Sequence, residues 1–316
     1  MKPAAGPYKA PWWLPGGHLQ TIVAALVPAP RIAWTRERWQ TPDGDFIDLD
    51  WIGRDENPGG PLLALFHGLE GSSASPYARA IAARAITMGW RCVVPHFRGC
   101  SGELNRLPRA YHSGDSAEIG WILERLQARH AVGISLGGNA LLKLLGEQGA
   151  AMNLHRAVAI SAPLDLAAAG RSLDAGFSRE IYTRIFLRTL KKKTFAKIAR
   201  QGIAVDPARL ERARTFWEFD DTVTAPLHGF LGADDYWARS SSGPWLPRIR
   251  VPTLILNARN DPFMPEAALD AVKASGEVPP NVVLEFPRSG GHAGFPGRDR
   301  WLARRVLDFL SSPSAP

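Results

Sequence analysis

The spacing of hydrophobic residues changes along this 316-residue chain, and each change predicts a different element. Residues 37–41 and 46–51 alternate polar and apolar positions around a Pro-Asp-Gly-Asp turn, which is typical of a β-hairpin. Residues 62–66 are continuously apolar, as in a parallel strand that is buried on both faces. We expect further strands at residues 92–94, 131–134, 157–160, 253–256 and 282–286.

Helical spacing separates these strands. Apolar residues recur every three or four positions from Ala78 to Ile86, and again in a final helix that contains Val306. A third helix is expected from about Asp115, with Glu118 three residues later in an arrangement like a capping box. Alternating strands and helices predict an α/β fold, with a mostly parallel sheet and helices on both faces.

The alternation stops between residues 164 and 250, where the chain becomes helical, charged and aromatic. We interpret residues 164–250 as a helical cap inserted into a single α/β core, which comprises residues 31–163 and 251–310. Residues 1–30 are rich in Pro, Trp and Gly, and we expect an irregular N-terminal arm that packs on the core. Residues 311–316 are expected to be a disordered tail.

Composition and charge limit the environment and the partners. The start of the chain does not resemble a secretory signal, and the apolar run 22–27 is far shorter than the ~20 residues that span a bilayer, so we expect a cytoplasmic protein. Cys92 and Cys100 lack metal-ligand spacing and are expected to be thiols. The net charge of +8 comes mostly from scattered arginines, and no nucleic-acid motif accompanies it. We therefore expect no nucleic-acid partner.

The only run of like charges, residues 191–193, lies in the expected cap and is predicted to form a solvated helix face. Apolar residues are interspersed with basic ones in this region, at Ile181, Ile185, Phe186, Leu190 and Phe195. This pattern admits a weak contact of the basic cap with an anionic membrane surface. Packing of the apolar face on the core is the alternative that we favour. The sequence says nothing about oligomeric state.

A serine lies between two glycines where a strand should give way to a helix. Residues 131–139 read Ala-Val-Gly-Ile-Ser-Leu-Gly-Gly-Asn, which contains the G-x-S-x-G pattern. A nucleophile on so sharp a turn has strained backbone angles, so Gly133 and Gly137 must be small. The turn exposes the Ser135 hydroxyl and directs the Leu136 amide toward a developing negative charge. The alternative is a glycine-rich turn with an incidental serine.

A serine hydroxyl becomes a nucleophile only when a base accepts its proton and a third group orients that base. His292 lies in a glycine-rich loop between the last strand and the last helix, where it can reach the serine. Asp261 follows the strand 253–256 and is our candidate acid. Asp165, at the end of the preceding strand, is the alternative. A purely structural Asx-turn before Pro262 is the other interpretation of Asp261.

The loop after strand 62–66 is expected to supply a second donor to the oxyanion. Gly68 permits a tight turn there that presents the Leu69 amide beside that of Leu136. The neighbouring His67 ends a buried strand. We therefore expect it to be a packed, hydrogen-bonded histidine and not the base.

Several longer motifs resemble, in content and order, those of the α/β-hydrolase superfamily. More narrowly, they resemble the YheT-type hydrolases, which are related to eukaryotic α/β-hydrolase-domain esterases. The motifs are PGGHLQTI (15–22), HGLEGSSASPY (67–77), HFRGCSGELNRLPRAYH (96–112), AVGISLGGN (131–139), FDDTVTAPLHGF (219–230), DYWARSS (235–241), NDPFM (260–264) and GGHAGF (290–295). Two departures are Leu104, where proline is expected, and Asn260, where an acid is common.

The resemblance implies an α/β-hydrolase fold and a triad of Ser135, Asp261 and His292. It also implies hydrolysis of carboxylic esters, short acyl esters or monoacylglycerols among them. We therefore expect a small-molecule ester or lipid as substrate and no metal or organic cofactor. Two alternatives stay open: an acyltransferase that uses the same triad, and a non-catalytic binding protein with this fold.

Overall fold

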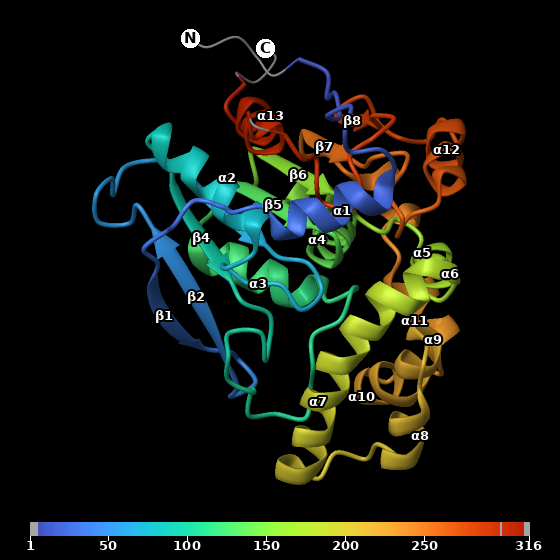
Figure 1. Cartoon of the computed structure of the whole chain (residues 1–316). Helices are drawn as coiled ribbons and strands as arrows, with labels where there is room; N and C mark the ends of the chain where they lie inside the picture. Colours follow the sequence, from blue (N-terminus) through green and yellow to red (C-terminus); the bar gives the residue numbers. More distant parts are fainter. Residues whose placement is uncertain (1–5, 298, 313–316) are drawn as a thin grey trace.

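An eight-stranded sheet forms the centre of the computed structural model, which describes residues 6–297 and 299–312. The strand order is β1-β2-β4-β3-β5-β6-β7-β8 (Figure 1). Strand β2 pairs antiparallel with both of its neighbours, β1 and β4, whereas β3 to β8 run parallel to one another. The strands are β1 (Thr35–Gln40), β2 (Phe46–Ile52), β3 (Leu62–Phe66), β4 (Arg91–Pro95), β5 (His130–Ile134), β6 (Arg156–Ile160), β7 (Thr253–Leu256) and β8 (Val282–Glu285). All eight predicted strands are confirmed.

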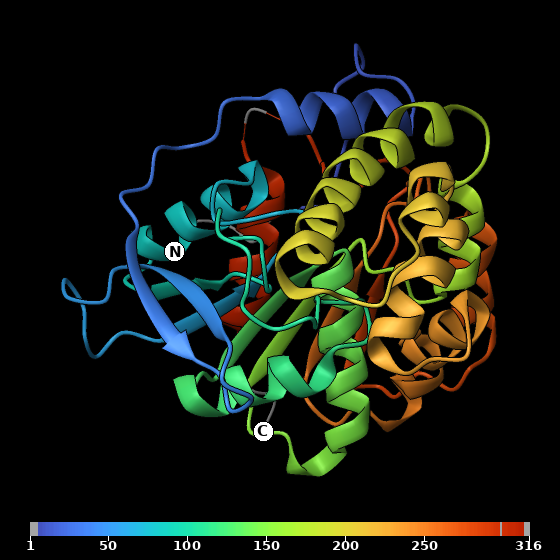
Figure 2. The ribbon, with the colours of Figure 1, turned by 90° about the horizontal axis from the view of Figure 1, so that it is seen from below.

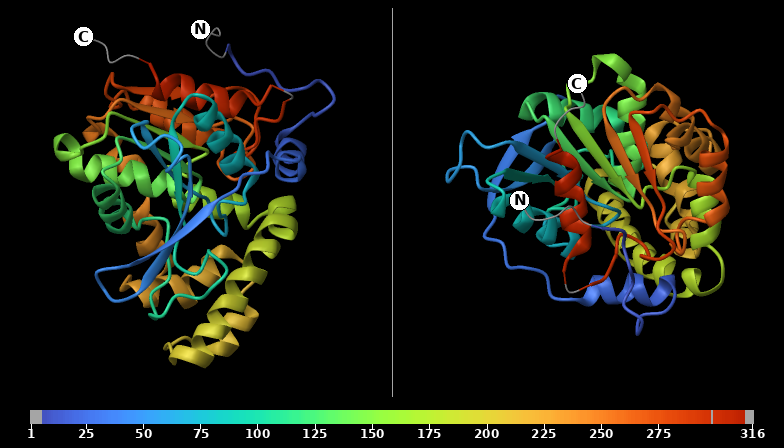
Figure 3. Two further views of the ribbon diagram at one scale, coloured as in Figure 1. Left: turned by 90° about the vertical axis from the view of Figure 1, so that its left-hand side faces the viewer. Right: turned by 90° about the horizontal axis from the view of Figure 1, so that it is seen from above.

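Helices cover both faces of this sheet, as Figures 1 and 3 show. Helices α2 (Pro76–Thr87) and α13 (Trp301–Leu310) pack on one face. Helices α3 (Ser116–Leu126), α4 (Leu136–Gln148) and α12 (Glu266–Ala274) pack on the other, and the short η1 (Gly149–Ala151) follows α4. Along β3, Leu63 and Leu65 contact the first layer, whereas Leu62 and Phe66 contact the second. The strand is apolar throughout because both of its faces are buried.

Residues 161–252 contain helices and no strand, as the sequence predicted. Figure 2 shows these helices grouped beside the sheet. They form two apolar clusters of their own, separate from the clusters of the sheet. Their order is α5 (Leu166–Leu173), α6 (Gly176–Ser178), η2 (Arg179–Thr183), α7 (Arg184–Gln201), α8 (Pro207–Arg212), α9 (Phe216–Phe219), η3 (Asp220–Thr224), α10 (Ala225–His228), α11 (Ala233–Ser240) and η4 (Gly243–Arg248). We keep the name cap for residues 164–250.

The prediction of an irregular N-terminal arm is wrong for residues 17–26, which form helix α1 (Gly17–Leu26). This helix lies beside η2 and the beginning of α7, and His18 bonds to Tyr182 of η2 (Figure 2). At the other end of the chain, Ser311 and Ser312 continue from α13 with hydrogen-bonded amides, and residues 313–316 of the predicted tail lie outside the described part. Within the described residues, no helix has the length and apolar character needed to cross a bilayer.

Two local predictions about charged residues are also wrong. Glu118 does not form a capping box at the start of α3; its buried carboxylate accepts a 2.6 Å hydrogen bond from Arg98 instead. Burial, together with the neighbouring Asp115, raises the pKa of Glu118 above its usual range. In the basic run of the cap, Lys191 donates to backbone carbonyls and Lys193 donates to Glu70, so these two lysines are not simply solvated.

Candidate active site

The loops that carry the candidate site residues follow four parallel strands. Leu69 follows β3, Ser135 follows β5, Asp261 follows β7 and His292 follows β8. Because these strands are parallel, their carboxyl ends meet at one edge of the sheet. Ser135 and His292, which are 157 positions apart in sequence, are therefore neighbours.

Ser135 occupies a strained turn between β5 and α4. Its backbone angles are φ 52° and ψ −118°, in the left-handed half of conformational space that side-chain-bearing residues rarely adopt. A Cβ atom on Gly133 would lie 2.4 Å from the carbonyl oxygen of Gly137. A Cβ on Gly137 would lie 2.6 Å from the carbonyl oxygens of Phe66 and His67. Only glycine fits at both positions, which confirms the prediction of a strained turn with two obligatory small residues.

The structure brings Ser135, His292 and Asp261 into one hydrogen-bonded chain. His292 Nε2 lies 2.9 Å from Ser135 Oγ, and His292 Nδ1 lies 3.1 and 2.9 Å from the two carboxylate oxygens of Asp261. A carboxylate can only accept, so Nδ1 carries the proton and Nε2 of the neutral ring accepts from the serine hydroxyl. The Asp261 side chain is fully buried, and the ring of Phe263 stacks on the imidazole with centroids 4.0 Å apart. This geometry permits proton transfer from the serine to the histidine.

Asp261, and not Asp165, contacts the histidine. Asp165 is exposed and caps α5, where its carboxylate accepts a 2.9 Å hydrogen bond from the Ala168 amide. Asp261 also accepts a 2.8 Å bond from the amide of Phe263. The Asx-turn that we considered as a purely structural role is therefore present together with the contact to His292.

Helix α1 holds the loops of the acid and the histidine, which the sequence did not reveal. Thr21 Oγ1 accepts a 2.8 Å hydrogen bond from the amide of His292. Gln20 Oε1 accepts from the amide of Gly290 at 2.7 Å and from the side-chain amide of Asn260 at 3.0 Å. The motif at residues 15–22 contains Gln20 and Thr21, but no local pattern shows that their partners lie at least 240 positions away.

Two backbone amides lie close to the serine. The Leu136 amide belongs to the first residue of α4, at the positive end of the helix dipole. The turn that contains Leu69 approaches from β3, and a Cβ atom on Gly68 would lie only 3.2 Å from the Cβ of Ser135. Leu69 itself lines both of the cavities that meet at the serine.

The amides on either side of Leu69 are occupied by phenol oxygens. Gly68 donates to the hydroxyl of Tyr77 at 3.0 Å, and Glu70 donates to the hydroxyl of Tyr111 at 2.9 Å. The Leu69 amide between them has no hydrogen-bond acceptor within the described part of the chain. It is thus available to a substrate oxygen.

A lysine of the cap stabilises this turn. Glu70 has a positive φ of 55°, and its Oε1 accepts from Tyr111 at 2.8 Å and from Lys193 Nζ at 2.7 Å. On the other side of the turn, buried His67 donates from Nδ1 to the Gly68 carbonyl and accepts from a backbone amide at Nε2. Burial lowers the pKa of His67 to about 3, so the ring is neutral. This environment confirms a packed, hydrogen-bonded histidine.

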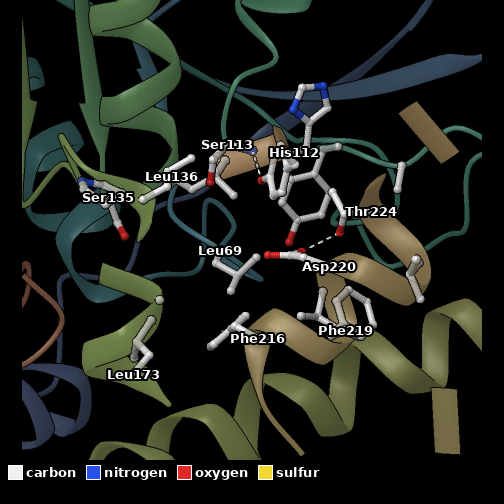
Figure 4. Close-up of a pocket in the computed structure, with 18 of the residues that line it drawn as sticks. Leu69, His112, Ser113, Ser135, Leu136, Leu173, Phe216, Phe219, Asp220 and Thr224 are labelled. Atoms are coloured by element: carbon white, nitrogen blue, oxygen red, sulfur yellow. Dashed lines mark hydrogen bonds between the residues drawn. The ribbon is translucent and has the colours of Figure 1, made fainter. Parts of the chain in front are cut away.

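Two apolar cavities meet at Ser135 and His292, and both residues line both of them. The inner cavity, of about 150 Å³, lies between the sheet edge and the cap (Figure 4). The outer cavity, of about 1100 Å³, lies beside α1 and reaches the surface at Leu26 and Ile185, whose exposed fractions are 76% and 61%. In the described residues, no group of three or more His, Cys, Asp or Glu side chains is placed to hold a metal ion.

The family described as "alpha/beta hydrolase fold" matches residues 61–298 of the sequence. The chain belongs to this family. It is 40% identical over 314 residues to "Putative esterase YheT" of Escherichia coli (strain K12), covering 93% of this chain and 90% of that protein. It is 28% identical over 319 residues to "Phospholipase ABHD3" of Homo sapiens, covering 95% and 77% respectively. This α/β hydrolase is therefore related to proteins that carry esterase and phospholipase names.

Solved structures agree with the fold. The serine hydrolase CCSP0084 from Cycloclasticus zankles superposes with a TM-score of 0.59 at 16% identity, covering 89% of this chain and all of that one. At this identity the likeness shows the fold alone.

Proposed function

We propose that this α/β hydrolase is a serine esterase that cleaves carboxylic esters through an acyl-enzyme on Ser135. The observation that carries the proposal is the hydrogen-bonded chain from Ser135 through His292 to Asp261 at the carboxyl edge of the sheet. A strained serine, a histidine with a fixed tautomer and a buried carboxylate are the parts that nucleophilic acyl transfer requires.

In the proposed reaction, Ser135 Oγ attacks the ester carbonyl carbon while His292 Nε2 accepts the hydroxyl proton. The Leu69 and Leu136 amides donate to the oxyanion that forms. The bond between the carbonyl carbon and the alcohol oxygen then breaks, and His292 gives its proton to the leaving alcohol. Asp261 stabilises the imidazolium in between.

Water completes the cycle. It attacks the acyl carbon and gives a proton to His292, and Ser135 leaves with that proton as the acid is released. No other group of the protein has to change its protonation state.

The two cavities suit the two parts of an ester substrate, the acyl chain and the alcohol. Leu136, which carries a proposed oxyanion amide, lines only the inner cavity, and Ala293, next to the histidine, lines only the outer one. The leaving oxygen must face His292 to receive its proton. We therefore assign the acyl chain to the inner cavity and the alcohol part to the outer cavity. Their apolar linings suit short-chain esters or monoacylglycerol-like lipids.

Paired substitutions of the two candidate acids test the proposal. With p-nitrophenyl butyrate, Asp261→Asn should lower kcat by about 10⁴-fold, because the histidine loses the carboxylate that fixes its tautomer. Asp165→Asn is the matched control and should leave kcat near the wild-type value, since Asp165 only caps α5. The proposal fails if the Asp165 variant loses turnover and the Asp261 variant keeps it, or if the wild-type protein cleaves no ester.

A further inference from the structure

The inner cavity has a carboxyl group away from the serine. Figure 4 shows Ser135 on one side of this cavity and Asp220 farther along it, with Leu69 and Leu136 between them. The hydroxyl of Thr224 lies beside Asp220 (Figure 4). An apolar passage thus leads from the proposed nucleophile to a polar end.

Asp220 is buried without a cationic partner. Thr224 Oγ1 donates to one carboxylate oxygen at 2.6 Å, and Trp237 Nε1 donates to the other at 2.8 Å. Both donors are neutral, and no salt bridge joins Asp220 to a described residue. A carboxylate has about four lone-pair sites, so about two stay free. Burial raises the pKa of Asp220 to about 7, against the opposing effect of these two hydrogen bonds.

The nearest histidines do not supply the missing charge. His112 lines the same cavity and packs against His228, with ring centroids 4.4 Å apart and ring planes tilted by 55°. Burial lowers the pKa of His112 to about 4 and that of His228 to about 3, so both rings are neutral near pH 7. Three cations also line the cavity, but each is engaged elsewhere: Arg98 with Glu118, Lys193 with Glu70 and Lys197 with the Leu107 carbonyl. A cation that pairs with Asp220 would therefore come from the substrate.

The adjacent acid provides a contrast. Asp221 is directed away from the cavity, where it pairs with Arg209 at 3.0 Å and accepts from the Ala233 amide at the start of α11. Both acids belong to η3, a π-helical turn. Such widened turns occur frequently at functional sites. The turn places one carboxylate in a structural pair and the other in the cavity wall.

We propose that Asp220 is a specificity-determining residue that binds a hydrogen-bond donor, a hydroxyl or an ammonium group, at the distal end of the acyl chain. The apolar passage accommodates the methylene groups, and the donor occupies the free lone pairs of the carboxylate. A chain that ends in a methyl group leaves these sites unpaired, which costs binding energy in a buried environment. The inference rests on the proposed esterase function and adds a substrate class to it.

Wild-type protein provides the first test. Rates of cleavage are measured for p-nitrophenyl esters of linear acids from butyrate to dodecanoate, each with a methyl, hydroxyl or amino terminus, after correction for spontaneous hydrolysis. At the length that reaches Asp220, kcat/KM for a hydroxyl- or amino-ended ester should exceed that of the methyl-ended ester by about tenfold or more. Comparison of the two donors shows whether the cavity selects a neutral or a charged group. Preference for the methyl-ended ester at every length overturns the inference.

Matched variants provide the second test. Asp220→Leu removes both acceptors at similar volume, so the preference for donor-ended esters should disappear. Asp221→Leu changes the adjacent acid outside the cavity and should retain the preference. The inference is also overturned if Asp220→Leu keeps the wild-type ratio. Thermal unfolding checks that each variant is folded, and if Asp220→Leu is not, the wild-type series decides alone.

The two proposals fail in different ways. If the wild-type protein cleaves no ester, the proposed function is lost. If it cleaves methyl- and donor-ended esters equally well, the function stands and the role of Asp220 is lost.

Discussion

At the scale of single residues, Asp220 should give the protein a measurable pH dependence of stability. Its pKa is raised from 3.8 to about 7 in the folded state by burial, so the folded protein binds this proton more tightly than the unfolded chain does. The stability that this proton contributes is fully present below about pH 4 and is lost as the pH rises through about 7.

Asp220→Asn removes this titration. Between about pH 4 and pH 8, the free energy of unfolding of the wild type should fall relative to that of the variant. Denaturant unfolding of both proteins across this range measures the difference. Parallel pH profiles would show that Asp220 does not titrate in this window.

From the sequence, a residue of the site could be predicted only where a local pattern restricts which residue type can occupy the position. Ser135, Asp261 and His292 could be selected because each follows a strand and their order suits the fold, and the structure brings them together. Asp220 could not be selected, because nothing in the neighbouring sequence distinguishes it from Asp221. Only the contact with Thr224 in the same turn, the contact with Trp237 of α11 and the lining of the cavity reveal that one of the two acids faces a cavity.

At the scale of elements, α1 should act as a positioning element for the histidine. Thr21→Val removes the acceptor of the His292 amide, so the histidine loop should shift and kcat should fall by about tenfold to a hundredfold. Thr21→Ser keeps the hydroxyl and should restore kcat. Steady-state turnover of a p-nitrophenyl ester compares the three proteins. Undiminished turnover in Thr21→Val would exclude this role for α1.

The arm was mispredicted because the buried side of α1 is polar. Its buried residues are Gln20 and Thr21, whereas the apolar Leu19 and Leu26 are exposed. Hydrophobic periodicity identifies a helix only when the apolar side packs on a core. Here hydrogen bonds to distant loops hold the helix, and the close approach of Gly17 to the Asn260 carbonyl leaves no room for a side chain.

Helix α7 should contribute to the oxyanion site through Lys193. Lys193→Met removes the ammonium group that holds Glu70 in its strained conformation of positive φ, so the turn around Leu69 should shift and kcat should fall several-fold. Lys192→Met changes the exposed neighbour and is the matched control. Turnover of the same ester is the readout, with KM measured alongside. Equal rates in the two variants would show that the contact does not affect the turn.

At the scale of the whole molecule, the apolar residues of the basic cap divide between two roles. Phe186 and Leu190 pack within the molecule, as we favoured, whereas Ile185 stays exposed at the mouth of the outer cavity, which we expect to contact a membrane surface. Exposed Leu26, Val27 and Ile185 line this cavity, and Arg184 and Arg188 are exposed on the same helix as Ile185. Apolar side chains flanked by basic ones suit the boundary of an anionic bilayer. We predict co-sedimentation with phosphatidylserine vesicles that weakens at high salt and in the double variant Arg184→Glu/Arg188→Glu. Unchanged sedimentation of this variant would contradict membrane docking.

The architecture of the whole molecule was more predictable than the path of its cap. Buried parallel strands require continuous apolar runs, and these runs located β3 to β8. Alternation around a turn located β1 and β2. In the cap, short helices and two π-helical turns pack on one another through residues that have no regular spacing, such as Leu187, Leu210 and Phe219. The sequence therefore could not predict that the inner cavity extends to Asp220.

Formation of a covalent intermediate on Ser135 is tested most directly by incubation of the purified protein with a fluorophosphonate, followed by mass spectrometry of the intact protein and of its peptides. We predict a single adduct on Ser135 that is absent from Ser135→Ala. A wild-type protein that stays unmodified, or an adduct that persists in Ser135→Ala, would contradict the claim.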